Sequence, residues 1–376
     1  MNPFTYGTVA TGESFYDRDK ECDHIVKTLA GGNNIVMYAP RRFGKTSLVV
    51  KAIQQLEKQG FICIYFDFMP VFSTESFVRL YSKSLAKQQS NLQKFASTFS
   101  TIVKNIRPVI KFGLDGNPEF SIDITSKQID ETDVSQLFDL TESFARSNKP
   151  ILVFFDEFQE VEKLKEINFE GLLRSKIQHQ QQVNYLFFGS KTHMMQAMFN
   201  DKKRPFYNAA SQMTISYLPK EDTIEFLQNN FLKKRIELNT EIANYIIKVT
   251  ANIPYYIQQL ASEIWLNTKE EGIISIKLVD MCVEQVIIMK KDYFMELFEN
   301  QSASKKQLLI ALCANGENIF SESYRSTHRL PSTATLQRAE RGLIYDGVID
   351  KIDNEHFITD PFFKLFLNSY INKFTY

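Results

Sequence analysis

The chain has no excess of charge of either sign, few cysteines, and no apolar run long enough to span a bilayer. Its 376 residues include 44 lysines and arginines and 44 aspartates and glutamates. With no net charge, no field over the whole molecule attracts the chain to nucleic acid or to an anionic membrane. Contact with nucleic acid would therefore need a local patch of basic side chains.

The low cysteine content also excludes common kinds of site. The four cysteines are far apart and form no CxxC pair: Cys22, Cys63, Cys282 and Cys313. We expect reduced thiols in the protein core rather than metal ligands or disulfides. The N-terminal residues lack the basic and apolar stretches of a signal peptide, so we expect a cytoplasmic protein without a membrane partner.

The chain does contain enough apolar residues for several cores. It is 44% hydrophobic and 23% charged, which is ordinary for a globular protein of this length. A chain of this composition can bury two or three cores, and we expect more than one domain.

One segment has the pattern of a phosphate-binding loop. NNIVMYAPRRFGKTSLVV, residues 33–50, runs from an apolar strand through a loop into a helix that Gly60 ends. A helix N-terminus after such a loop binds phosphate because unpaired N–H groups and the helix dipole point at the anion. We predict that the nucleotide is held by Pro40, Arg41, Arg42, Phe43, Gly44, Lys45, Thr46 and Ser47.

Three of these residues have specific roles in the GxxxxGK[ST] pattern. Gly44 lets the backbone approach the phosphates, Lys45 supplies a cation, and the Thr46 hydroxyl is placed to bind Mg²⁺. The first glycine of the pattern is absent, because Ala39 stands in its place. An alanine fits there if its φ is negative.

A second apolar strand ends in two carboxylates. The run from Ile151 to Phe155 suits a parallel strand that is covered on both faces, and Asp156 and Glu157 follow at its carboxyl end. We predict that Asp156 holds Mg²⁺ and that Glu157 polarises the attacking water. Another strand ends at Ser190, whose hydroxyl either contacts the γ phosphate or the water, or caps the helix that follows.

These strands, together with FICIYFDFM at residues 61–69, make four βα repeats. Such repeats predict a parallel sheet with crossover helices.

Five strings of the sequence resemble the archaeal-type ATPase family, a group in the AAA+ and STAND branch of P-loop NTPases that is related to origin-recognition and helicase-loader ATPases. The strings are FYDRDKE (15–21), APRRFGKTSL (39–48), FFDEFQE (154–160), FFGSKTHMM (187–195) and IPYYIQQLA (253–261). The resemblance covers most of the chain and implies an α/β fold. That fold has a P-loop parallel sheet with flanking helices, a helical lid and a C-terminal winged helix.

The resemblance also assigns roles to residues and implies ATP and Mg²⁺ as cofactors. Lys45 and Thr46 match the Walker A residues, Asp156 and Glu157 the Walker B pair, and Ser190 the polar sensor-1 residue. Two departures concern the lid. The segment before the lid proline, TANIP, lacks the glycine that is normal there, and no arginine stands near the sensor-2 position.

The domain boundaries follow from these patterns. We expect an ATPase core over residues 1–216, with a helix and hairpin insert at about 71–150, then a lid over 217–298 and a winged helix over 299–376. In the insert, a polar helical stretch over 74–105 precedes a β-hairpin around Asp115-Gly116. That hairpin is either surface decoration or an edge that binds a partner.

The lid begins with a helix at Pro219, and its apolar stripe contains the single tryptophan, Trp265, which we expect in the core.

The winged helix carries little net charge. Residues 301–376 contain nine lysines and arginines against eight aspartates and glutamates, which leaves +1. We expect a helix that Gly316 closes, a second helix near Ser332 and a strand pair that turns at Asp353-Asn354. Its available basic residues are Arg325, Arg329, Arg338, Arg341 and Lys351. This charge is small for a module that binds DNA largely through phosphates, so duplex DNA and a protein partner both stay open.

The remaining question is which cation stabilises the transferred phosphoryl group. Arg204 follows the strand that ends at Ser190, and Arg41 and Arg42 are its rivals. An arginine of this kind acts in cis or from a neighbouring subunit of a nucleotide-dependent oligomer. Two functions compete: an ATP-driven switch that moves the winged helix on DNA or a protein, and a nucleotide-binding scaffold with negligible turnover.

Overall fold

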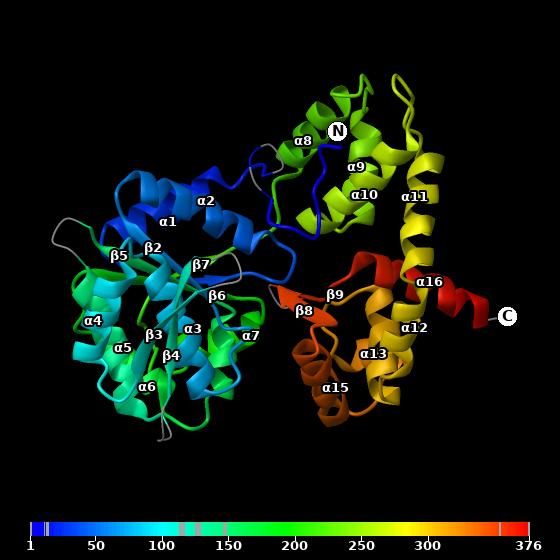
Figure 1. The fold of residues 1–376 in the computed structure, drawn as a ribbon. Helices are drawn as coiled ribbons and strands as arrows, with labels where there is room; N and C mark the ends of the chain where they lie inside the picture. The colour runs from blue at the N-terminus through cyan, green and yellow to red at the C-terminus, as the bar shows by residue number, and fades with distance from the viewer. Residues whose placement is uncertain are drawn as a thin grey trace. The chain divides into compact units, whose positions relative to one another are not determined.

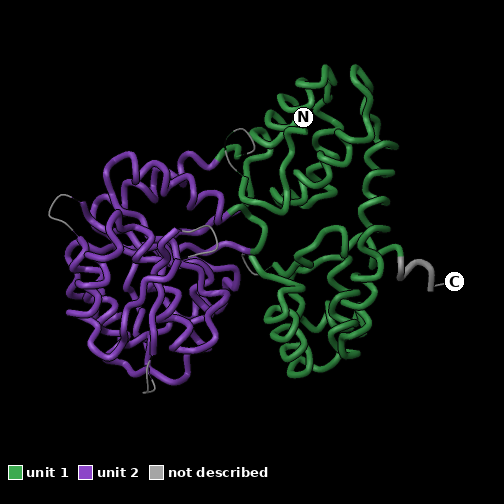
Figure 2. Tube along the Cα trace, viewed as in Figure 1, with its two compact units in different colours: residues 1–17, 41–44, 217–376 green, residues 18–40, 45–216 purple. Residues whose placement is uncertain are grey.

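The computed structural model describes residues 2–10, 12, 15–112, 117–124, 129–145, 149–352 and 355–374, with side chains as far as Ser369. The expected turns at Asp115-Gly116 and Asp353-Asn354 lie outside these residues. The chain forms two compact units (Figure 2). Unit 1 contains residues 1–17, 41–44 and 217–376, and unit 2 contains residues 18–40 and 45–216.

Unit 2 contains a five-stranded parallel sheet in the order β2-β5-β6-β1-β7 (Figure 1). The strands are β1 (Ile35–Tyr38), β2 (Ile62–Asp67), β5 (Ile151–Asp156), β6 (Val183–Gly189) and β7 (Ser211–Thr214). Every residue of β1 and β5 is buried, as expected for central strands with helices on both faces. The predicted parallel α/β sheet is confirmed.

Helices cover both faces of this sheet. Figure 1 shows α1 (Asp19–Ala30) and α2 (Lys45–Lys58) on one side and the remaining helices of unit 2 on the other. The latter are α3 (Thr74–Lys87), α4 (Leu92–Ile102), α5 (Glu131–Phe144), α6 (Phe169–Ile177) and α7 (Thr192–Asn200).

The sequence patterns predict four of the five strands but not β7. This edge strand, SQMT, has a single buried side chain, that of Met213. It therefore lacks the apolar run that reveals the other strands.

The insert between β2 and β5 differs from the expectation in one respect. The stretch over 74–105 forms two helices rather than one, because Asn91 begins α4 by accepting a hydrogen bond from the N–H of Lys94. The predicted hairpin is present as β3 (Arg107–Phe112) and β4 (Pro118–Asp123) in antiparallel register. Phe120 of β4 is buried with its ring centre 4.7 Å from that of Phe95, so this hairpin contributes to the core.

In unit 1, the residues predicted to form the lid are helical. These helices are α8 (Lys220–Leu232), α9 (Thr240–Val249), α10 (Pro254–Asn267), α11 (Ile276–Met289) and α12 (Lys291–Glu299). The N-terminal segment packs on these helices, since Asn2 donates to the Ser262 hydroxyl and Phe4 contacts the rings of Phe231 and Trp265. Trp265 is 8% exposed, which confirms that it belongs to the core.

The chain continues into the winged helix. Its elements are α13 (Ala303–Ala314), α14 (Glu322–Thr327), α15 (Thr333–Tyr345), β8 (Ile349–Ile352), β9 (Glu355–Ile358) and α16 (Pro361–Phe374). Ser332 precedes α15 as expected. Gly316, in contrast, does not close α13, which ends at Ala314. A Cβ atom at Gly316 would lie 1.6 Å from the carbonyl oxygen of His356, so the close approach of β9 requires glycine there.

The cysteines are free thiols as predicted. Cys22, Cys63 and Cys282 are buried, Cys313 is partly buried, and burial raises the pKa of all four. Among the described residues, no helix combines the length and the apolar character needed to cross a bilayer.

Candidate functional site

The predicted residues of unit 2 come from three adjacent strands. Tyr38 of β1 lies in register with Gly189 of β6, so Ala39 and Ser190 leave the sheet at the same level. β5 pairs with the other side of β6 and supplies Asp156 at its end. The carboxyl ends of parallel strands form the edge where ligands bind in open α/β sheets.

Lys45 lies at the first residue of α2 and is only 7% exposed. Its Nζ donates to the carbonyl oxygens of Ala39 (3.1 Å) and Pro40 (3.0 Å). A buried ammonium group is costly to desolvate, and ionised phosphate oxygens are stronger acceptors than neutral carbonyls. The side chain therefore lies where an anion at the helix N-terminus would gain a charged partner.

The backbone of the phosphate loop (residues 39–46) contains two left-handed residues. Gly44 has φ +83° and Arg42 has φ +71°. The φ of Ala39 is not positive, so an alanine is tolerated at the position of the missing glycine. Residues 41–44 of the loop group with unit 1, and Lys45 follows them directly in unit 2.

Asp156 is the most perturbed carboxylate of the predicted site. Its Oδ1 accepts from the N–H of Glu157 (2.8 Å), and its Oδ2 accepts from the Tyr65 hydroxyl. Burial raises the pKa of Asp156 to about 6, and the hydrogen bond from Tyr65 opposes that shift. Asp67 lies beside it in register, and burial raises the pKa of that carboxyl too. A bound cation would offset this cost, so the donor set fits Mg²⁺.

Glu157 and Ser190 meet directly. Oε2 of Glu157 accepts from the Ser190 N–H (3.0 Å) and hydroxyl (2.7 Å), and also from Nε2 of Gln159 (2.6 Å). The helix that follows begins after Lys191, which occupies the N-cap position without a capping side chain. The Ser190 hydroxyl donates to the Glu157 carboxylate, so its predicted contact with phosphate or water stays a prediction.

Sequence patterns do not reveal two of these partners. Tyr65 is one aromatic residue in an apolar strand, and only the pairing of β2 with β5 brings its hydroxyl to Asp156. Gln159 is fully buried in the turn after β5 and packs against Gly189. A Cβ atom at Gly189 would lie 1.9 Å from Oε1 of Gln159, so the glycine in FFGS is a signal for this close packing.

Arg204 contacts two glutamates. One of its Nη atoms lies 3.0 Å from Oε1 of Glu162, and its Nε donates to Oε2 of Glu170 at 3.1 Å. Its side chain is 30% exposed. A role in trans would require Arg204 to exchange these partners, and this role stays a prediction.

The lid segment TANIP adopts the left-handed backbone conformation that glycine favours, although it contains no glycine. Ala251 and Asn252 have φ values of +52° and +54°. Asn252 tolerates this conformation better than alanine and also donates through Nδ2 to the carbonyl oxygen of Leu218 at 2.8 Å. The strain is therefore concentrated at Ala251.

Comparison with known proteins identifies the family and the fold. A family model described as an ATPase domain predominantly from Archaea matches residues 15–260. The chain belongs to this archaeal ATPase family. A second model, a probable winged helix domain, matches residues 292–369. A comparison with curated proteins gives no match.

Two solved structures are similar to this archaeal-type ATPase over nearly its whole length. A Walker-type ATPase of Pyrococcus abyssi shares 19% identity with a TM-score of 0.63, covering 95% of this chain and 97% of that chain. The ORC2 protein of Aeropyrum pernix, solved in ADPNP–ADP complexes, shares 11% identity with a TM-score of 0.51, covering 95% and 94%. At these identities the likeness shows the fold, which is the predicted α/β core with a winged helix.

Proposed function

We propose that this ATPase binds Mg²⁺·ATP at its phosphate loop and hydrolyses it with Glu157 as the general base. The observation that carries the proposal is the meeting of Glu157 and Ser190 at the ends of β5 and β6, next to the buried Asp156. A general base and the group that orients it need this direct contact.

Each residue of the site has one task in this scheme. Lys45 exchanges two loop carbonyls for phosphate oxygens, and the first N–H groups of α2 bind the same anion. Thr46 and Asp156 would hold Mg²⁺, which neutralises phosphate charge when it is bound. Ser190 holds the Glu157 carboxylate in one position, from which it accepts a proton from water.

A scaffold with negligible turnover is the second candidate, and one observation favours it. Oε2 of Glu157 already accepts from three donors, two from Ser190 and one from Gln159. That oxygen cannot also accept a proton from water until a donor leaves. On this account hydrolysis is slow unless a donor leaves Oε2 or water reaches the other oxygen, Oε1.

The experiment that separates these functions is a steady-state assay of phosphate release from Mg²⁺·ATP by the full chain. We expect turnover by the wild type, and turnover that falls by about a hundredfold or more for Glu157→Gln. Equal rates for the two proteins would contradict the role of Glu157. Measurable nucleotide binding with no turnover above background would favour the scaffold.

We further propose that the winged helix carries the nucleotide state to duplex DNA or to a protein. Arg338 and Arg341 are exposed on α15, whereas Glu340 between them turns inward to His356, at 2.8 Å. The exposed face is therefore locally basic although the domain is almost neutral. This local charge supports weak, salt-sensitive DNA binding with little base preference.

Charge reversal tests the partner. Arg338→Glu with Arg341→Glu should abolish DNA binding, measured by fluorescence anisotropy with and without ATP. The matched control is Lys87→Glu with Lys94→Glu, which makes the same charge change at exposed positions of unit 2. Loss in both double variants would indicate only a general charge effect. If neither affects DNA but the first disrupts a complex with a protein, the protein partner is the better account.

A further inference from the structure

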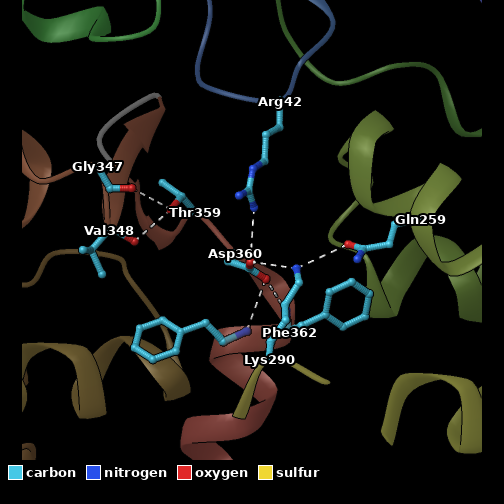
Figure 3. A network of polar contacts seen from close by, with 9 residues as sticks. Arg42, Gln259, Lys290, Gly347, Val348, Thr359, Asp360 and Phe362 are labelled. Carbon is cyan, nitrogen blue, oxygen red and sulfur yellow. Dashed lines mark hydrogen bonds and ion pairs between the residues drawn. The ribbon is translucent and has the colours of Figure 1, made fainter. Parts of the chain in front are cut away.

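Arg42, in the middle of the phosphate loop, groups with unit 1 and contacts the winged helix at Asp360 (Figure 3). Its Nη1 lies 3.1 Å from Oδ2 of Asp360. Its guanidinium carbon lies 4.9 Å from the ring centre of Tyr255 and 4.8 Å from that of Tyr256. An ion pair and two cation–π contacts thus join one side chain of the loop to α10 and to the start of α16.

Asp360 lies at a junction within the winged helix. Its Oδ1 accepts from the N–H of Phe362 (2.9 Å) in the first turn of α16, and its side chain is 12% exposed. The preceding residue, Thr359, donates its hydroxyl to the carbonyl oxygens of Gly347 (2.8 Å) and Val348 (3.0 Å), just before β8. A movement of Asp360 would therefore reach both α16 and the base of the β8–β9 hairpin.

A second cation shares the same carboxylate. Nζ of Lys290, which follows α11, lies 3.5 Å from Oδ2 of Asp360 and 3.4 Å from Oε1 of Gln259 (Figure 3). Burial lowers the pKa of Lys290, and the nearby Arg42 guanidinium adds to that shift while Asp360 opposes it. Asp360 is thus the anion that offsets two partly buried positive charges.

The contact holds a strained backbone. A left-handed conformation is unfavourable for an L-residue with a Cβ atom, and Arg42 adopts it at φ +71°. The carbonyl oxygen of Arg42 also accepts from the N–H of Tyr255 at 3.4 Å. Left-handed residues in a loop turn successive N–H groups toward one point, which is how such loops bind anions. The side-chain contacts of Arg42 therefore favour this shape of the loop.

We propose that Arg42 and Asp360 are positioning residues whose ion pair holds the phosphate loop in its binding conformation and couples it to the winged helix. This inference rests on the proposed binding of nucleotide at the loop. Because coupling is reciprocal, bound nucleotide strengthens the attachment of α16 by the same free energy that the attachment contributes to nucleotide binding.

A simple charge effect predicts the opposite result. Removing the carboxylate of Asp360 makes this part of unit 1 more positive, which by Coulomb's law alone would favour an anionic ligand. If the pair positions the loop, removing it instead weakens nucleotide binding. The sign of the change in affinity separates the two accounts.

The test is titration calorimetry of the full chain with Mg²⁺·ADP, which avoids turnover. Asp360→Asn keeps a side chain that can cap α16 but removes the charge. Arg42→Gly removes the anchor and also the backbone strain. We expect each variant to raise the Kd about fivefold or more. The Kd of the double variant should not exceed that of the single variant that binds less tightly, as for partners in one interaction.

Two controls exclude general damage. Thr359→Val removes the hydroxyl bond beside Asp360 but leaves the ion pair, and its Kd should match the wild type. In hydrogen exchange, Mg²⁺·ADP should slow the amide of Phe362 in the wild type but not in Arg42→Gly.

The outcomes separate this inference from the function on which it rests. Wild-type binding of ADP with unchanged or tighter binding by Asp360→Asn would overturn the inference alone, as would strictly additive losses. A wild type that binds no nucleotide would overturn the proposed function and the inference together.

Discussion

Ser190 donates both its N–H and its hydroxyl to one oxygen of Glu157, at 3.0 and 2.7 Å. The two residues come from the ends of neighbouring strands, so the sheet itself sets the position of this carboxylate. Two donors from one residue at the end of β6 thus hold this carboxylate in one place.

The first prediction follows from this contact. Ser190→Ala removes one of the two donors and leaves the carboxylate in place, so it should lower kcat less than Glu157→Gln does. Neither change should alter the Kd for Mg²⁺·ADP by more than about twofold, because neither removes a phosphate ligand. Single-turnover rates together with calorimetry would check this. A Ser190→Ala variant with much weaker ADP binding would instead indicate direct contact with the nucleotide.

Lys45→Ala should remove most nucleotide affinity. Loss of a charge-assisted partner from a desolvated phosphate costs roughly 2 to 4 kcal/mol. The matched control is Lys51→Ala on the same helix, whose ammonium group pairs with Asp19 at the surface. Calorimetry should show a large loss for the first variant and almost none for the second. Retained tight binding by Lys45→Ala would contradict the assignment of the loop.

Asp156→Asn should stabilise the nucleotide-free protein while it abolishes Mg²⁺-dependent turnover. The pKa of about 6 lies above the ordinary 3.8, so the folded state holds this group less favourably once it is ionised. Above pH 6 the gain from asparagine is on the order of 2 to 3 kcal/mol. It should fade as the pH falls from 6 toward 4. Scanning calorimetry at pH 5 and pH 8 would measure this, and an equal gain at both values would contradict the account.

Ala251→Gly should stabilise unit 1. The left-handed backbone at φ +52° favours glycine, and the net gain after the cost in unfolded-chain entropy is roughly 0.5 to 1 kcal/mol. The same change at Ala243, which is buried in the middle of α9, should destabilise by about 1 kcal/mol. Fluorescence of Trp265, the single tryptophan, follows the unfolding of unit 1. Shifts of the same sign for both variants would contradict the argument.

Arg204→Ala tests the proposed action in trans. If Arg204 serves a neighbouring subunit, turnover per molecule rises with protein concentration, and inactive Glu157→Gln protein partly restores the rate of Arg204→Ala. If Arg204 only pairs with Glu162 and Glu170, the variant loses stability but keeps a rate that does not depend on concentration. Mixed-variant assays with a thermal melt of each protein distinguish the two.

The strands and motifs that were predictable are those whose signal is local. The apolar run of β5 and the loop before α2 can be read from neighbouring residues, and both are present. β7 was not predictable because Met213 is its single buried residue, and a four-residue edge strand owes its conformation to its neighbour β1. The need for glycine at position 316 was not predictable either, because it comes from a carbonyl group on β9, far along the chain.

The partners of the site residues were the least predictable part. The pattern identifies Asp156 but not Tyr65, since their contact depends on which strand lies beside β5. The pattern also does not reveal that the Arg42 guanidinium lies against Tyr256 and Asp360. Arg42 and Asp360 are 318 positions apart, and no period or spacing in a single sequence connects them.

The strand order has a consequence for how the protein folds during synthesis. In the order β2-β5-β6-β1-β7, only β5 and β6 are neighbours both in sequence and in the sheet. β1 can pair only after β6 and β7 have been synthesised, and the ion pair of Arg42 can form only after residue 360 has been synthesised. Contacts of such long sequence separation slow folding, because the intervening chain has to be ordered first. The phosphate loop is thus synthesised long before the segments that complete its native contacts.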